Sequence, residues 1–161
     1  MPKFVPLEKS YKDGKRNVSH KLIGDVEIPL HEARYHNKRD IEVFRKWLKN
    51  NMNELPNEEK IAFYKEVSGK DTNHNKYRSL DWDKPSPTIV SHLYKDGLMF
   101  IHPDIEQLRS ITIREAALLQ SFPLDYLFVG SNAYCFKMVG NAVPVLFAKK
   151  IAEAVCEVVG D

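Results

Sequence analysis

Apolar positions recur at helical spacing in two consecutive segments of the first half of the chain. Residues 41–52 are apolar at every third or fourth position, and Asp40 can cap the helix that this spacing predicts. Residues 51–56, Asn-Met-Asn-Glu-Leu-Pro, interrupt the pattern, and Asn57 can cap a second helix with further apolar positions up to residue 67. We therefore expect a helical pair.

The pattern becomes extended after residue 77. Residues 88–92 and 98–101 are short runs rich in apolar and β-branched side chains, and an Asp-Gly pair lies between them. This arrangement predicts an antiparallel hairpin. Residues 1–39 show no sustained period, so we expect irregular structure there, with turn chemistry at residues 12–14 and a short strand candidate at Val26–Leu30.

Two helices are predicted near the C-terminus. Residues 112–115, Thr-Ile-Arg-Glu, form a capping-box sequence that opens a helix ending near Gln120, before Phe-Pro at residues 122–123. Pro144 suits the first position of the last helix. That helix is apolar over most of its circumference, whereas a surface helix of a small domain needs only one apolar stripe. We therefore infer a missing partner surface.

Composition narrows the class of protein. The chain has 161 residues, a formal net charge of +2 and abundant aromatic and charged side chains, which is typical of a globular protein and not of a disordered tail. It shows no signal peptide and no apolar run long enough to span a bilayer. Cys135 and Cys156 have no CxxC spacing, so a reducing cytoplasm is expected. The six histidines are scattered, and no metal site is expected.

Positive charge is concentrated at the N-terminus. The first twenty residues hold five cationic side chains against two acidic ones, namely Lys3, Lys9, Lys12, Lys15 and Arg16 against Glu8 and Asp13. Two interpretations stay open: a phosphate-binding arm, or a solvated and partly disordered one.

Two segments carry a resemblance to a known family. Residues 109–123 read Arg-Ser-Ile-Thr-Ile-Arg-Glu-Ala-Ala-Leu-Leu-Gln-Ser-Phe-Pro, and residues 140–144 read Gly-Asn-Ala-Val-Pro. In this order and near this spacing they resemble the last two conserved blocks of the DNA (cytosine-5) methyltransferases. Residues 77–92 look like the end of the target-recognition region in bacterial restriction-modification methylases, and residues 32–40 resemble a segment of some such regions.

The resemblance also shows what this chain lacks. In the family, a cysteine thiolate that follows a proline adds to C6 of a flipped cytosine, and a Glu-Asn-Val carboxyl group stabilises the adduct. C5 then takes the methyl group of S-adenosylmethionine, which a Gly-rich turn holds. Here Cys135 follows Tyr134 and Cys156 follows Val155, and the chain has neither a Glu-Asn-Val triplet nor a closely spaced glycine pair. We assign no catalytic residue and expect no activity from this chain alone.

The resemblance implies a role for the turn before the last helix. It places Asn141 and Ala142 in contact with the cofactor, with Gly140 permitting close backbone approach. The alternative is structural, with Gly140 and Asn141 forming a helix C-cap. Arg114 and Glu115 are expected to form a structural pair without a catalytic role.

The resemblance also implies DNA contacts. Thr88 matches a threonine that contacts a phosphate beside the flipped base, and Arg78 stands where some relatives place an arginine that reads guanine. A strand-end salt bridge is the alternative for Arg78. Arg34, Lys38 and Arg39 supply donors for phosphate or base contacts, with solvated surface as the alternative.

We therefore expect an α+β chain in three parts. Residues 1–39 form a basic arm and the start of the recognition region, and residues 40–108 form an otherwise irregular recognition lobe with a small antiparallel sheet. Residues 109–161 supply helices that complete an α/β methyltransferase domain located elsewhere. The expected function is that of one subunit of a split restriction-modification methylase, with double-stranded DNA and a larger methyltransferase chain as partners. The initiating methionine and the position of the last helix favour a natural subunit. A non-catalytic DNA-binding protein and a truncated remnant are the alternatives.

Overall fold

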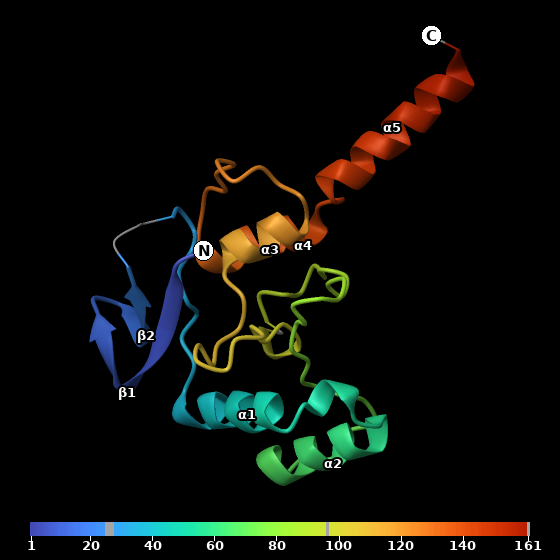
Figure 1. Cartoon of the computed structure of the whole chain (residues 1–161). Coiled ribbons are helices and arrows are strands. Elements are labelled where there is room, and N and C mark those ends of the chain that lie inside the picture. Colours follow the sequence, from blue (N-terminus) through green and yellow to red (C-terminus); the bar gives the residue numbers. More distant parts are fainter. Residues whose placement is uncertain (25–27, 96, 161) are drawn as a thin grey trace. The chain divides into compact units, whose positions relative to one another are not determined.

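The computed structural model describes residues 1–24, 28–95 and 97–160 (Figure 1). The strand predicted at Val26–Leu30 lies partly outside these residues, and its described part, residues 28–30, is not a strand. The chain divides into two compact units, each described by itself. Unit 1 comprises Met1–Glu27, Glu32–Pro85 and Asp96–Ile111, and unit 2 comprises Ile28–His31, Ser86–Lys95 and Thr112–Asp161.

Unit 1 begins with an antiparallel hairpin of strands β1 (Lys3–Asp13) and β2 (Arg16–Ile23). Gly14 has a φ of 57°, the left-handed conformation that a two-residue hairpin turn requires. The expectation of irregular structure was therefore wrong for residues 3–23. The pattern did not reveal the strands because the register is broken between Pro6 and Tyr11, and because residues 8–17 are exposed on both faces of the ribbon.

The base of the hairpin is anchored to residues 107–109 of the same unit. The Phe4 side chain is buried, and the backbone N–H of Phe4 donates to Gln107 Oε1 at 3.0 Å. The Arg109 guanidinium lies 5.0 Å from the centre of the Phe4 ring, and His20 Nε2 lies 3.2 Å from the Leu108 carbonyl oxygen. These contacts attach one end of the ribbon to the core and leave its turn end exposed.

The predicted helical pair is present as α1 (Lys38–Lys49) and α2 (Asn57–Ser68), joined through the short 3-10 helix η1 (Met52–Glu54). The cap of α1 is Asn37, whose side chain accepts the Asp40 N–H at 2.9 Å, so the helix begins before the predicted position. The two helices and residues from the rest of unit 1 enclose one apolar cluster of Val43, Phe44, Trp47, Met52, Phe63, Tyr77, Ile101 and Leu108.

The hairpin predicted at residues 88–101 was wrong. The described residues of this segment contain no strand, and residues 97–99 form the 3-10 helix η2 (Gly97–Met99). The backbone around residues 98–101 pairs instead with residues 78–80: the Arg78 N–H donates to Leu98 O, and the Ile101 N–H donates to Arg78 O. The small antiparallel sheet thus exists, but at the N-terminus, where β1 and β2 form it.

Unit 2 contains helices α3 (Ile113–Leu119), α4 (Asn132–Asn141) and α5 (Val145–Val159). The capping box of α3 is confirmed in both directions: the Glu115 N–H donates to Thr112 Oγ1 and the Thr112 N–H to the Glu115 carboxylate. Helices α3 and α4 contact one another, and both bury apolar residues, among them Ala116 and Ala117 of α3 and Val139 of α4.

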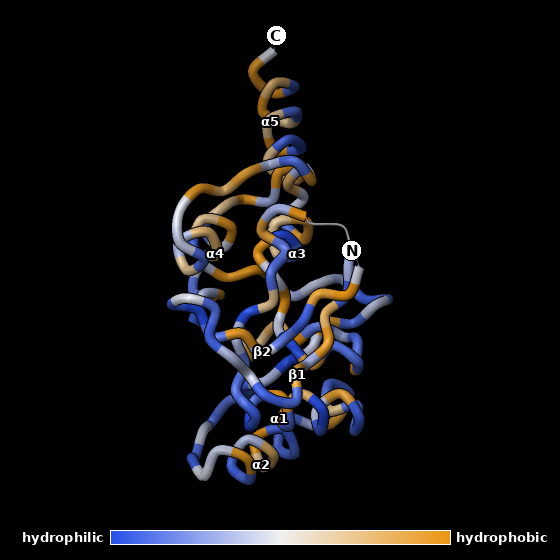
Figure 2. Tube along the Cα trace, turned by 90° about the vertical axis from the view of Figure 1, so that its left-hand side faces the viewer, coloured by the Kyte–Doolittle hydropathy of each residue, from blue (hydrophilic) through white to orange (hydrophobic). Residues whose placement is uncertain are grey.

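Helix α5 has no buried residue. It begins at Val145. Pro144, predicted as the first helical residue, is the N-cap and so lies one position earlier in the helix than expected. Figure 1 shows α5 extending away from α3 and α4, and Figure 2 shows hydrophobic residues along much of its length, interrupted by hydrophilic ones. The described chain is therefore an α+β structure with a two-stranded antiparallel sheet.

Candidate nucleic-acid interface and cofactor-contacting elbow

Three of the predicted DNA-contacting residues, Arg34, Lys38 and Arg39, lie in residues 32–39, which lead into α1 and are called the basic segment. Lys38 and Arg39 are the first two residues of the helix, and both are exposed. Cations at a helix N-terminus oppose the helix dipole, so Lys38 is not explained by helix stability. Arg39 pairs with Asp40 at 3.3 Å. Arg34 is half-buried, and burial lowers its pKa. A side chain at Gly97 would come within 2.6 Å of Arg34 Nη1, so the glycine makes room for the guanidinium.

His36 holds this segment against β2. Its backbone N–H donates to Ser19 Oγ at 2.9 Å, and its Nε2 accepts the Ser110 N–H at 3.1 Å. Burial, followed by the charges of His20, Arg34 and Arg109, lowers the pKa of His36 from 6.5 to about 3. The imidazole is therefore a neutral acceptor near pH 7, and it fixes the basic segment in place.

Arg78 combines a fixed backbone with an exposed side chain. Its N–H donates to Leu98 O at 3.1 Å, and its carbonyl accepts the Ile101 N–H at 2.9 Å. Its guanidinium forms no ion pair within residues 1–24, 28–95 and 97–160, which leaves the proposed strand-end salt bridge without a partner there. A fixed backbone and a planar guanidinium without an ion-pair partner among the described residues suit bidentate recognition of a base or phosphate.

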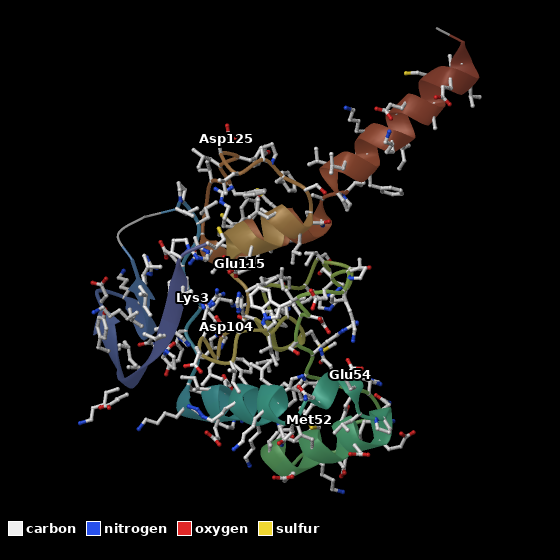
Figure 3. All side chains as sticks on the ribbon, in the orientation of Figure 1. Lys3, Met52, Glu54, Asp104, Glu115 and Asp125 are labelled. Carbon is white, nitrogen blue, oxygen red and sulfur yellow. The ribbon has the colours of Figure 1, made fainter. Side chains whose placement is uncertain are left out.

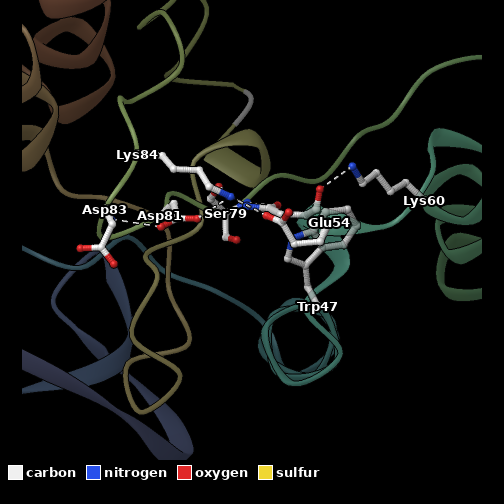
Figure 4. A network of polar contacts seen from close by, with 8 residues as sticks. Trp47, Glu54, Lys60, Ser79, Asp81, Asp83 and Lys84 are labelled. Atoms are coloured by element: carbon white, nitrogen blue, oxygen red, sulfur yellow. Dashed lines mark hydrogen bonds and ion pairs between the residues drawn. The ribbon is translucent and has the colours of Figure 1, made fainter.

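A polar network holds the residue next to Arg78 (Figure 4). Asn53 Oδ1 accepts the Trp47 Nε1–H at 3.0 Å and the Ser79 N–H at 3.2 Å, and its amide donates to Ser79 O at 2.8 Å. These residues line a cavity of about 490 Å³ in unit 1, beside the exposed Trp82. The network therefore positions the backbone that carries Arg78.

Thr88 lies in unit 2, on the irregular segment of residues 86–95. Its side chain is exposed, whereas the next residue, Ile89, is buried. The segment is anchored through its apolar side chains and presents the threonine hydroxyl to solvent. Arg78 belongs to unit 1, so each of these two residues is described within its own unit.

Residues 140–145 comprise the end of α4, the turn that follows it and the first residue of α5, and they are called the elbow. Asn141 is the last residue of α4 and is exposed, and Ala142 is the cap that follows it. Both backbone groups of Ala142 are engaged, since its N–H donates to Val139 O and its carbonyl accepts from Gln120 Nε2 at 3.1 Å. The Asn141 amide forms no hydrogen bond in the described part of the chain. Asn141 thus fits a polar contact to a cofactor, and Ala142 fits only an apolar wall.

Gln120 is a positioning residue that sequence reasoning missed. Its buried amide donates to both Val139 O and Ala142 O, and its backbone carbonyl accepts the Val145 N–H at 3.0 Å. It therefore binds the end of α4 and the start of α5 together. One signal for this role is present in the sequence, because Gln120 is a polar residue directly after the apolar pair Leu118 and Leu119 at the end of the predicted helix.

Gly140 and Asn141 are the last two residues of α4, and the helix cap is Ala142, so the helix ends at this turn as the structural alternative expected, with its cap one residue later. The close backbone approach expected at Gly140 is to this chain itself. A side chain there would collide with the Val90 carbonyl and lie 2.8 Å from Ser91 Cα.

The two cysteines and the residues Arg114 and Glu115 have the following surroundings in the described part of the chain. Cys135 is buried, and burial raises the pKa of its thiol, which disfavours the nucleophilic thiolate. Cys156 is exposed on α5. Arg114 is buried and donates through Nε to the Pro29 carbonyl, and Glu115 accepts from Thr112, so both have structural contacts.

The described residues contain no cluster of three His, Cys, Asp or Glu side chains that could hold a metal ion. None of the helices in this part of the chain has the length and apolar character needed to cross a membrane.

The chain matches the family of C-5 cytosine-specific DNA methylases over residues 5–157. It is 48% identical to the Type II methyltransferase M.AgeI of Thalassovita gelatinovora over 81 residues. This matched stretch is 50% of this chain and 18% of that protein. It is 37% identical over 127 residues to M1.HphI of Haemophilus parahaemolyticus, covering 78% of this chain and 30% of that protein.

A further relative, the Type II methyltransferase M.AquIB of a Picosynechococcus species, is 45% identical over 92 residues, which are 50% of this chain and 63% of that protein. The chain spans less than a fifth of M.AgeI. No solved structure matches it. The match over nearly the whole sequence, with the blocks at residues 109–123 and 140–144, shows that this chain belongs to the C-5 cytosine-specific DNA methylase family.

Proposed function

We propose that this chain is the target-recognition and C-terminal portion of a DNA (cytosine-5) methyltransferase, acting as one subunit of a split restriction-modification methylase. The larger chain carries the catalytic blocks. The assembled enzyme transfers a methyl group to C5 of a cytosine rotated out of double-stranded DNA, and S-adenosylmethionine supplies that group when bound. The observation that carries the proposal is α5, a 15-residue helix without a buried side chain on a chain of this family.

The chemistry requires groups from elsewhere. Cytosine C5 is a weak nucleophile until a thiolate has added to C6, and that thiolate must be accessible and ionised. Cys135 is buried with a raised thiol pKa, and neither cysteine follows a proline. The nucleophile and the adduct-stabilising carboxyl group are therefore assigned to the larger chain, and this subunit is expected to be inactive alone.

The exposed face of α5 is the proposed contact with the larger chain. Seven large apolar side chains of this helix are more than a third exposed: Val145, Leu146, Phe147, Ile151, Val155, Val158 and Val159. A contiguous apolar surface of this kind marks an interaction site. M.AquIB supports the division into chains, since a match of 92 residues covers 63% of it and it is therefore a short protein as well.

The elbow gives the assembled enzyme one side of its cofactor site in this proposal. Asn141 offers the unoccupied amide, Ala142 the apolar wall, and Gln120 and Gly140 keep the turn in position. In the reconstituted enzyme, Asn141→Ala should raise the KM for S-adenosylmethionine and leave the DNA affinity of this chain unchanged. Loss of DNA binding in the variant would contradict a cofactor role.

The DNA-contacting set is Arg78, Thr88, Arg34, Lys38 and Arg39. Arg78→Ala should weaken binding to the cognate duplex by about 1–3 kcal/mol, because a bidentate contact to guanine is lost. Fluorescence anisotropy with cognate and unrelated duplexes measures this difference, and Lys76→Ala, an exposed cation two residues away, is the control. Equal weakening on every duplex would assign Arg78 to phosphate instead.

Reconstitution tests the function as a whole. The chain, a candidate larger chain carrying the Pro-Cys block, and their mixture are assayed for transfer of labelled methyl groups to DNA. Activity in the mixture alone is expected. Methyl transfer by this chain alone would refute the proposal. Specific DNA binding without activity alongside any larger chain would favour a non-catalytic DNA-binding protein.

A further inference from the structure

We infer that the β1–β2 hairpin is a DNA-backbone clamp, in which exposed lysines bind phosphates beside the residues that read the target. The inference rests on the proposed function, because it requires the chain to bind DNA. It goes beyond that function because none of the five residues assigned to DNA above lies in the hairpin.

The hairpin carries the positive charge of the chain. Residues 1–24 hold six cationic side chains and two acidic ones, whereas the whole chain has a formal net charge of only +2. The remaining residues are therefore negative overall. A single element with all of the excess positive charge is the electrostatic footprint of a nucleic-acid contact.

Two of these cations form ion pairs, and four form none in the part of the chain that the structure describes. Lys3 pairs with Asp104 at 3.1 Å (Figure 3), and Arg16 pairs with Glu32. The other four are exposed and have no ion pair among the residues that the structure describes: Lys9, Lys12, Lys15 and Lys21. Exposed ammonium groups on one ribbon are available to an anion.

The exposed half of the hairpin does not serve core packing. Residues 8–17 are all exposed, and Tyr11 keeps 57% of its surface accessible. Two strands with no buried face gain little stability from one another. A twisted two-stranded ribbon is, however, one of the two elements that fit the major groove of B-DNA. The extension is thus better explained by contact with DNA than by folding.

The hairpin also lies beside the basic segment that precedes α1. The Arg16–Glu32 ion pair joins the turn end of the ribbon to that segment, and the His36 N–H to Ser19 Oγ bond joins it to β2. Cations separated by some twenty residues in the sequence, in the hairpin and at Lys38 and Arg39, therefore belong to one surface of unit 1. Such a surface can follow a phosphate backbone over several nucleotides.

The test compares two variants with the same change in net charge. The first is Lys9→Gln, Lys12→Gln and Lys15→Gln, and the control is Lys46→Gln, Lys65→Gln and Lys70→Gln, at exposed positions in α1, in α2 and just beyond α2. Anisotropy titrations of the full chain, alone and with the larger chain, measure the dependence of log K on log salt concentration. Each lost phosphate contact should reduce the slope by about 0.9, so the hairpin variant should lose about 2–3, equally on cognate and unrelated duplexes.

The control variant should keep the slope of the original chain, and both variants should keep its melting temperature. An unchanged slope in the hairpin variant, or an equal loss in both variants, would overturn the inference and leave the proposed function standing. An unchanged slope with weaker association to the larger chain would also overturn it and assign the hairpin to a protein partner. Absence of DNA binding by the original chain, alone and with the larger chain, would overturn the proposed function and the inference together.

Discussion

At the scale of single residues, two buried polar side chains determine where the exposed ones point. His36 fixes the basic segment through Ser19 and Ser110, and Gln120 joins the two helices of the elbow. Neither side chain is placed to contact DNA or cofactor directly. A buried polar group that is fully hydrogen-bonded specifies one local geometry, because every competing arrangement leaves a donor or acceptor unsatisfied.

The environment of His36 predicts a pH dependence of stability. Its folded-state pKa of about 3 lies below the ordinary value of 6.5, because of burial and the nearby His20, Arg34 and Arg109. The unfolded chain therefore binds the proton more readily than the folded chain. The contribution of His36 to the free energy of unfolding should be complete above pH 6.5 and should fall as the pH is lowered towards 3. Denaturant titrations at pH 7 and pH 5 measure the loss.

His36→Asn removes the titrating ring and should flatten this dependence, with a residual slope from His20, whose pKa burial also lowers. His74→Gln, at an exposed loop position, should leave the slope as it is. A flat profile in the original chain would mean that the imidazole is protonated without cost in the folded state.

At the scale of secondary-structure elements, the ends of helices were more predictable than the pairing of strands. The capping box of α3 uses residues three apart in the sequence, so its partners are guaranteed to be close. Residues 88–92 have the composition of a strand, but no residue close in the sequence, within the described part of the chain, provides a pairing partner for them. Residues 78–80 pair with residues 98–101 instead, over a separation that no local pattern encodes.

The packing of α4 on residues 90–91 predicts the effect of Gly140→Ala. Inside a helix this substitution ordinarily stabilises by about 0.5–1 kcal/mol, because alanine restricts the unfolded chain. Here the added methyl group would collide with the Val90 carbonyl, so a loss of about 1–3 kcal/mol is expected in chemical denaturation. Asn141→Ala, one residue later and exposed, should change stability by no more than about 0.5 kcal/mol. Stabilisation by Gly140→Ala would show that α4 does not contact this segment.

At the scale of the whole molecule, α5 is the helix whose side chains the described part of the chain leaves uncovered. A helix with apolar side chains on most sides gains its stability from neighbours on those sides. The described chain provides none that bury it. The division into two units places Arg78 in unit 1, and Thr88 and the elbow in unit 2.

The exposed face of α5 should make the isolated chain self-associate or bind a hydrophobic dye. Replacing Phe147 and Ile151 with glutamate should abolish both properties and prevent assembly with the larger chain, while the melting temperature stays unchanged because neither side chain is buried. Lys149→Glu, on the polar stripe of the same helix, is the control. A dilute, dye-silent monomer of the original chain would contradict the missing partner surface.

Sequence patterns alone were enough to predict the family, the helical pair, the capping box of α3 and the apolar character of α5. These features are written in residues that are neighbours along the chain, or in blocks of fixed order, so no distant contact is needed to find them. The folded chain was needed to show that residues 3–23 form a hairpin, that the described part of residues 88–101 does not, and that Gly140 makes room for Val90. Each of these depends on which distant backbone group satisfies a hydrogen bond or fills a space, and that choice is made by packing and not by periodicity.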